Sequence, residues 1–67
     1  MIDILYPNIT VKLTDDDGNA FYILGKVMKA MREAGLEKQD IDLFYKDATS
    51  GDYDHLLQTV MRWVKVD

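Results

Sequence analysis

The chain has 67 residues and a formal net charge of −4, from twelve acidic and eight basic side chains. It contains no cysteine and one histidine, which excludes disulfides, thiolate metal sites and a multi-histidine site within one chain. The excess of acidic residues disfavours non-specific binding to nucleic acid, which needs a dense basic surface.

The N-terminal segment is predicted to be extended. Residues 1–6 are apolar apart from Asp3, and Pro7 follows them. Because a proline restricts the residue before it to extended backbone, two interpretations stay open. The segment is either a short edge strand or a tail over the core, in which case residues 1–8 form an extended arm.

A change of hydrophobic period predicts a strand-to-helix turn at residues 15–19. Apolar and polar residues alternate from Ile9 to Thr14, which predicts a strand, and helical spacing follows the turn. Gly18 is expected to adopt positive φ, and Asn19 to cap the helix. Three aspartates precede Gly18, but an EF-hand loop aligned on this glycine has leucines where its first and last oxygen ligands belong. No calcium site is therefore predicted.

The first helix is predicted over residues 20–34. Gly35 is expected to end it in left-handed backbone, with Leu36 folding back as the hydrophobic contact. Gly25 in mid-helix costs about 1 kcal/mol relative to alanine, and close approach of another backbone would compensate for this cost. The residues expected to face inward are Phe21, Leu24, Val27, Met28 and Met31, and those expected on the opposite face are Tyr22, Lys26, Lys29 and Glu33.

Two further helices are predicted, over residues 38–48 and 53–63, with a break of capping residues at 49–52. Residues 64–66 fit either a final helical turn or a short strand that pairs with residues 9–13. The residues expected on the buried faces are Ile41, Phe44 and Ala48 in one helix and Tyr53, Leu56, Leu57, Val60, Met61 and Val64 in the other. Of all these core positions, burial is predicted specifically for Leu24, Phe44, Leu57 and Met61.

These elements predict a small α+β fold over residues 1–67, in one domain. A short N-terminal strand precedes three helices, and a C-terminal strand is expected to pair with the first. The alternative is a three-helix bundle with an extended N-terminal arm. No apolar run approaches the roughly 18 residues of a membrane span. Residues 1–6 lack the basic region and the length of a signal peptide, so we expect a cytoplasmic protein without membrane contacts.

The sequence offers few residues for catalysis. His55 follows Asp52 and Asp54, and such a pair can act as a base. The residues around His55 are expected to face the core, however, and Ser50, the nearest nucleophile, is better explained as a turn or capping residue. Without a metal cluster or a phosphate-binding loop, we predict no enzyme and no cofactor.

The second and third helices resemble a helix-turn-helix in outline. A recognition helix presents its N-terminal end to DNA, and here that end carries Asp52 and Asp54, which repel phosphate. Arg62 and Lys65 lie at the opposite end. We therefore expect no measurable binding to duplex DNA at physiological salt.

The candidate residues for partner contact are aromatic and basic. Lys26, Lys29 and Arg32, together with Lys12, can form a small basic patch for an anionic partner, although solubility and complementarity to the helix dipole also explain them. Exposed aromatic residues favour protein partners, and Trp63, Tyr22 and Tyr45 are those expected at the surface. The predicted partner-contact residues are Tyr22, Lys26, Lys29, His55, Arg62 and Trp63.

Several segments carry a resemblance to a known family. They are Asp17-Gly18-Asn19-Ala20-Phe21, Ile23-Leu24-Gly25, Ala34-Gly35, the stretch from Ala48 to Leu57, and Trp63-Val64. From Ile9 onward the chain resembles a family of small proteins of bacteria and their phages and plasmids. That family has no assigned activity, so the resemblance implies an accessory or mobile-element context and no reaction. In the family a serine or similar cap precedes the second helix, where this chain has Glu37.

The sequence thus favours a non-enzymatic accessory module that binds another protein or a second copy of itself. The alternative is a small regulator that binds nucleic acid, or mimics it through its acidic surface. The two differ in salt dependence, because contacts with phosphates weaken steeply as salt rises and apolar contacts do not.

Overall fold

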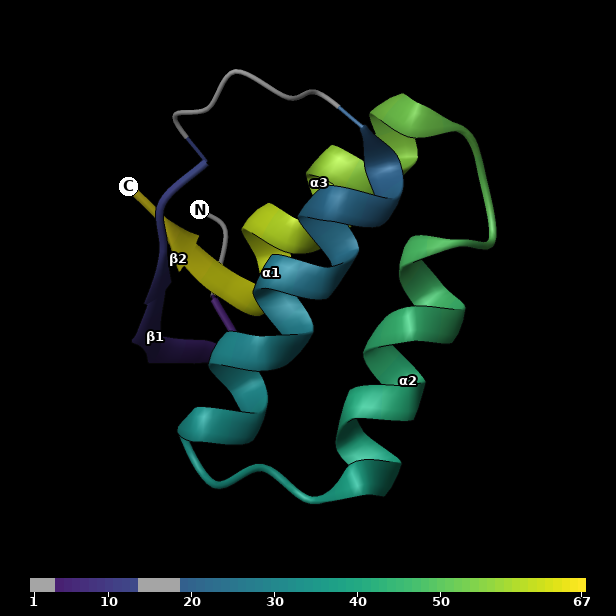
Figure 1. The fold of residues 1–67 in the computed structure, drawn as a ribbon. Helices are drawn as coiled ribbons and strands as arrows, with labels where there is room; N and C mark the ends of the chain where they lie inside the picture. The colour runs from purple at the N-terminus through teal and green to yellow at the C-terminus, as the bar shows by residue number, and fades with distance from the viewer. Residues whose placement is uncertain (1–3, 14–18) are drawn as a thin grey trace.

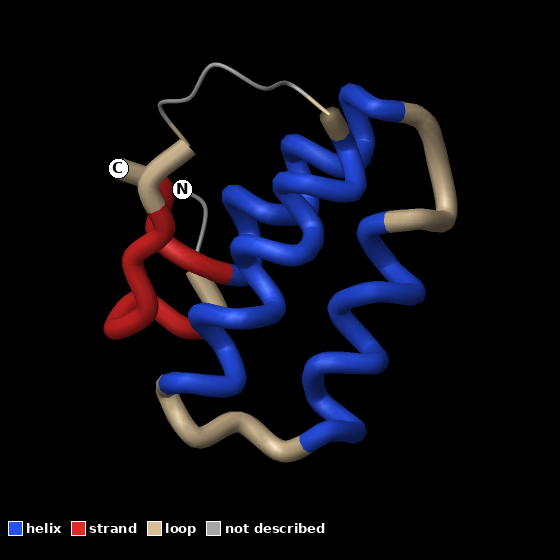
Figure 2. The backbone as a smooth tube through the Cα atoms, viewed as in Figure 1, coloured by secondary structure: helices blue, strands red, loops and turns tan. Residues whose placement is uncertain are grey.

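The computed structural model describes residues 4–13 and 19–67, and it confirms the predicted α+β fold. The elements are β1 (Tyr6–Val11), α1 (Ala20–Glu33), α2 (Lys38–Ala48), α3 (Tyr53–Trp63) and β2 (Val64–Val66). The two strands form a small sheet beside α1 and α3, and α2 lies on the far side of these helices (Figure 1). Figure 2 shows this separation of the strands from the helices.

Strand β2 pairs in parallel with β1, as one of the two interpretations of residues 64–66 predicts. The pairing is irregular, because Tyr6 lies opposite Val64 and Thr10 opposite Lys65, which leaves β1 residues 7–9 as an insertion. Pro7 has no N–H for a regular ladder and lies in this insertion. The N–H of Asp67 donates to the Val11 carbonyl at 2.9 Å and extends the pairing beyond β2.

The predicted bounds of the first strand, residues 9–14, are wrong. The strand begins at Tyr6 and ends at Val11. It begins at Tyr6 because this residue pairs with Val64 of β2, and the Tyr6 ring also stacks on Trp63 with ring centroids 6.0 Å apart. It ends at Val11 because its partner strand is short: β2 ends at Val66, which lies opposite Val11. Thr14 lies outside the described residues, as does Gly18, for which positive φ was predicted.

Both predicted caps of α1 are confirmed. The Asn19 side chain accepts a hydrogen bond from the Phe21 N–H at 2.8 Å. At the other end Gly35 has φ +92°, and the Leu36 N–H donates to the Met31 carbonyl at 3.1 Å. With the Gly35 N–H on the Arg32 carbonyl, these bonds form a Schellman motif. Leu36 is half-buried against the core.

The buried stripe of α1 differs in part from the prediction. Leu24, Val27 and Met31 are buried and Met28 is half-buried, but Phe21 is 76% exposed, and Ile23 is buried instead. Because successive residues turn by about 100°, Phe21 lies roughly 120° around the helix from Val27, whereas Ile23 lies only about 40° away. Phe21 is therefore outside the stripe that faces the core.

The predicted bounds of α2 and α3 are confirmed, as is burial of Ile41, Phe44 and Ala48. In α3, Leu56, Val60 and the following Val64 are buried. The predictions for Tyr53 and Met61 are wrong, because these side chains are 44% and 50% exposed. Leu57 is only half-buried, and Thr59 takes a core position on the same helix.

Thr59 shows how a polar residue is accommodated in this core. Its side chain is fully buried, and its hydroxyl donates to the His55 carbonyl one turn earlier, at 2.8 Å. Among residues 4–13 and 19–67, no buried side-chain polar atom lacks a hydrogen-bond partner. In the same described part of the chain, no helix has the length and apolar character needed to span a membrane.

Candidate functional site

A hydrogen-bonded cluster joins the end of α2 to the start of α3 around His55. The His55 Nε2 atom lies 2.9 Å from the Asp47 carbonyl oxygen, 3.1 Å from Ser50 Oγ and 3.3 Å from Thr59 Oγ1. A carbonyl oxygen can only accept, so Nε2 carries the proton in this arrangement. The Ser50 and Thr59 hydroxyls donate to carbonyls themselves, at 2.7 and 2.8 Å, so their lone pairs can share the single Nε2–H with the Asp47 carbonyl.

This geometry supports a structural role for His55. A histidine that activates a serine must present an unprotonated nitrogen to the hydroxyl, and here Ser50 meets the protonated Nε2. Asp52 does not orient the ring either, since its carboxylate accepts the His55 backbone N–H at 2.9 Å as the cap of α3. Ser50 donates to the Asp47 carbonyl at the end of α2, in keeping with its predicted role as a turn residue, and its contact with His55 helps to clamp the two helices together.

Trp63 belongs to the same region. Its ring meets Phe44 edge-on, with centroids 5.5 Å apart, and stacks on Tyr6. Its Nε1–H donates to Asp47 Oδ2 at 3.2 Å, while Asp47 Oδ1 lies 3.7 Å from His55 Nε2. Of the predicted contact residues, His55 and Trp63 are therefore only part-exposed and engaged within the fold. Arg62 is exposed on the last turn of α3.

Three predicted contact residues do come together, on the outer face of α1. Tyr22 is 44% exposed, and the Lys26 ammonium lies 5.8 Å from the centre of its ring, which is a cation–π contact. A shallow hollow on this face is lined by Phe21, Tyr22, Gly25, Lys26 and Lys29. The structure thus groups aromatic and basic side chains around a bare glycine backbone.

Lys12 adds a third lysine from outside the helix. It follows β1 and lines a neighbouring hollow together with Lys26 and Lys29. Arg32, which was predicted in the same patch, instead lines a hollow between α1 and α2, with Leu36 and Lys38 among its neighbours. The basic patch of the structure is therefore formed by lysines alone.

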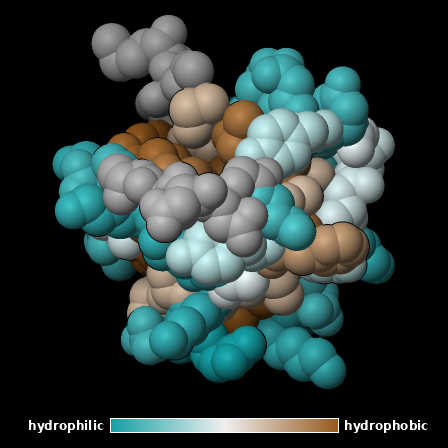
Figure 3. Space-filling model, turned by 45° about the horizontal axis from the view of Figure 1, so that its top comes forward, coloured by the Kyte–Doolittle hydropathy of each residue, from teal (hydrophilic) through white to brown (hydrophobic). Residues whose placement is uncertain are grey.

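Phe21 also borders an apolar groove on its other side. This groove runs between the start of α1 and the α2–α3 turn, and the exposed Phe21 and Tyr53 rings line it. On the face drawn in Figure 3, hydrophobic side chains reach the surface between hydrophilic ones. The two hollows that Phe21 borders together form what we call the Phe21 surface, made up of Phe21, Tyr22, Gly25, Lys26 and Lys29 of α1 and Tyr53 of α3.

Sequence reasoning missed Phe21 and Tyr53 because it counted both as core residues. For Phe21, its angular offset from Val27 was a usable indication. For Tyr53, its position in the first turn of α3 places it at the end of the stripe, where the groove lies open.

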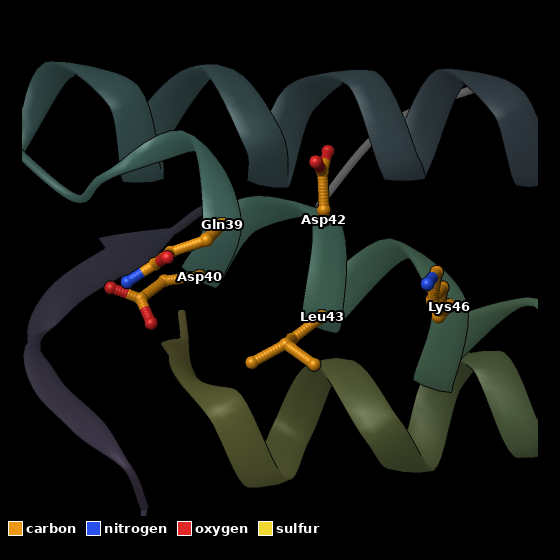
Figure 4. Close-up of a pocket in the computed structure, with 5 residues that line it drawn as sticks. All are labelled: Gln39, Asp40, Asp42, Leu43 and Lys46. Atoms are coloured by element: carbon orange, nitrogen blue, oxygen red, sulfur yellow. The ribbon is translucent and has the colours of Figure 1, made fainter.

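The outer face of α2 provides a contrast. Its side chains Gln39, Asp40, Asp42, Leu43 and Lys46 surround a shallow hollow, but they leave the helix in different directions and do not converge (Figure 4). Leu43 is 57% exposed. This face therefore resembles an ordinary solvated surface and supplies control positions for the experiments below.

No group of three potential metal ligands occurs in residues 4–13 and 19–67. The acidic turn, for which no calcium site was predicted, lies outside these ranges. Comparison of the chain with protein-family models, with curated proteins and with solved structures finds no match. The function is accordingly inferred from the Phe21 surface and the charges around it.

Proposed function

We propose that the chain is a non-enzymatic accessory module of the cytoplasm that binds another protein through the Phe21 surface. The observation that carries this proposal is the 76% exposure of Phe21, a large apolar residue that lies outside the buried stripe of α1. Burial of an exposed phenylalanine in a partner contributes about 1.5–3 kcal/mol. The accessory and mobile-element context implied by the resemblance agrees with a binding role.

The surroundings of Phe21 have the composition of a protein interface. Interfaces are enriched in aromatic residues at their centre and polar residues at their rim. Tyr22 and Tyr53 lie on either side of Phe21, and Lys26 and Lys29 form one edge of the surface. Such an arrangement supplies apolar anchors together with charges that select among partners.

The second candidate is a regulator that binds nucleic acid, and the group of Lys12, Lys26 and Lys29 favours it. Three phosphate contacts give a weak, salt-sensitive affinity. The net charge of −4 opposes approach of a polyanion. We therefore rank this candidate below protein binding.

Affinity purification from the producing cells tests the proposal. The tagged chain, a Phe21→Ser variant and a Leu43→Ser control would be captured in parallel, and the bound proteins identified by mass spectrometry. Leu43 is a matched control because it is also a large exposed apolar residue, 57% accessible on α2. We expect a protein that is retained by the native chain and the control but lost from Phe21→Ser.

Two outcomes contradict the proposal. One is a partner that Phe21→Ser retains as well as the native chain does. The other is micromolar binding of mixed-sequence DNA that weakens steeply with salt, measured by fluorescence anisotropy. Circular dichroism melts of both variants verify that each is folded.

A further inference from the structure

The outer face of α1 indicates what kind of partner the module takes. On the basis of the proposed function, we infer that the Phe21 surface binds an acidic segment of another protein. The backbone of this segment passes over Gly25, and its carboxylates face Lys12, Lys26 and Lys29.

Among residues 4–13 and 19–67, the side chains of this face carry a net positive charge, opposite to that of the whole chain. Lys12, Lys26 and Lys29 line one hollow, and Glu33 lines it as well, which leaves two positive charges in excess. Within the described part of the chain, none of these lysines forms an ion pair. Lysines without an ion-pair partner that converge on one hollow of an acidic protein form a local positive potential, which attracts carboxylates.

Gly25 supplies the second argument. It lies one turn after Phe21 and one turn before Lys29, at an exposed position. A Cβ added at Gly25 would meet no described atom within 4 Å, so the predicted close approach of another backbone is not made inside this fold. A mid-helix glycine lowers helix stability and permits close approach of a ligand backbone. The open space above Gly25 can therefore accommodate the backbone of a segment from another protein.

The same charges disfavour the other occupants. A second copy related by a two-fold axis through this face would bring its lysines against the same lysines, which is repulsive. Nucleic acid would meet three lysines on a chain whose net charge is −4. An acidic protein segment with an apolar anchor satisfies the lysines, the Phe21 ring and the bare backbone together.

Phage display provides an unbiased probe for this inference. Random 16-residue peptides would be selected on the purified chain, and the enriched sequences synthesised. We expect them to be acidic, with an aromatic or aliphatic residue, and to shift the backbone amide resonances of α1 around Gly25. Lys26→Glu combined with Lys29→Glu should weaken their binding about tenfold or more. Lys38→Glu with Lys46→Glu is the control, because it makes the same charge change on α2, away from the Phe21 surface.

Gly25→Ala separates binding from stability. It should raise the melting temperature of the free chain and yet weaken peptide binding several-fold, because the new methyl group occupies the path of the partner backbone. A merely structural glycine would not produce this opposite pair of effects. Unchanged peptide affinity in Gly25→Ala would refute passage of the backbone over this position.

Other results overturn the inference in different ways. Enriched peptides that bind the Phe21 surface but are neutral or basic would refute the acidic partner and leave the proposed function intact. Tighter binding of a single-stranded oligonucleotide, or a dimer that Lys26→Glu alters, would replace the acidic segment with those occupants. Capture of the cellular partner by Phe21→Ser would refute the proposed function itself, whatever the peptides show.

Discussion

Gly51→Ala is expected to loosen the clamp between α2 and α3. A Cβ at this position would lie 2.9 Å from both Cβ and Cγ of His55. These atoms form the base of the side chain and are held by the first turn of α3, so they cannot give way as a flexible side-chain end would. The start of α3 therefore has to shift, and this shift displaces the imidazole from its cluster.

The cost can be estimated from what the ring contacts. A hydrogen bond of the kind made by Nε2 contributes about 0.5–1.5 kcal/mol, and an extra methyl group forced against atoms that cannot move freely costs typically about 1–3 kcal/mol. Replacing glycine by alanine also reduces the conformational entropy of the unfolded chain, and this effect offsets roughly 0.4–1 kcal/mol of the lost stability. We expect a net loss of about 1–3 kcal/mol. A domain of this size has a total stability of about 3–5 kcal/mol.

Urea and thermal melts followed by circular dichroism measure this loss. Each kcal/mol corresponds to a fall of roughly 4–8 °C in melting temperature for a domain of this length. Gly25→Ala is the matched control: it makes the same chemical change where no described atom lies within 4 Å, and should stabilise by up to about 1 kcal/mol. Equal midpoints for Gly51→Ala and the native chain would refute the steric reasoning.

Four other outcomes are expected. Gly35→Val should cost about 1 kcal/mol or more in urea melts, because a β-branched residue is strained at φ +92°; an unchanged midpoint would contradict the left-handed cap. Leu56→Ala should cost about 2–5 kcal/mol, whereas Met61→Ala, which truncates a side chain that is 50% exposed, should cost far less, and the reverse order would mean that α3 is rotated. Asp47→Ala should lower the free energy of unfolding by about 1 kcal/mol, because the Trp63 Nε1–H loses its acceptor. In proton NMR spectra the indole N–H resonance should shift upfield, which reports on this bond specifically. Calcium at about millimolar concentration should leave the melting temperature unchanged, because the acidic turn lacks the terminal oxygen ligands of an EF-hand, and a chelator-reversible rise would contradict this.

The helices were predictable because their ends are marked by local chemistry. Asn19, Gly35 and Asp52 act within one turn of their own position, so their capping roles depend little on the rest of the fold. It was harder to predict which residues are buried, because the direction in which a helix docks on its neighbours decides which of its faces enters the core. A small change in docking direction decides whether an apolar residue at the edge of the periodic pattern is buried or exposed, and Phe21 and Met61 are both exposed.

Only the part of the candidate site that lies on a single helix could be predicted from the sequence. Helical spacing alone places Tyr22, Lys26 and Lys29 on one face of α1. The contribution of Lys12 depends on how β1 packs beside that helix, and no local pattern encodes this packing. The same holds for the His55 cluster, whose members become neighbours only through the geometry of the α2–α3 turn.

The parallel pairing of β1 with β2 has a consequence for synthesis of the chain. These strands are the first and last elements of the described fold, with three helices between them. During translation β1 leaves the ribosome long before its partner exists, so its hydrogen-bonding edge stays open while the helices form. Closing so long a loop is entropically costly and slow compared with local helix formation. The sheet is therefore expected to assemble after the helices and to complete the fold only when residues 64–66 are released.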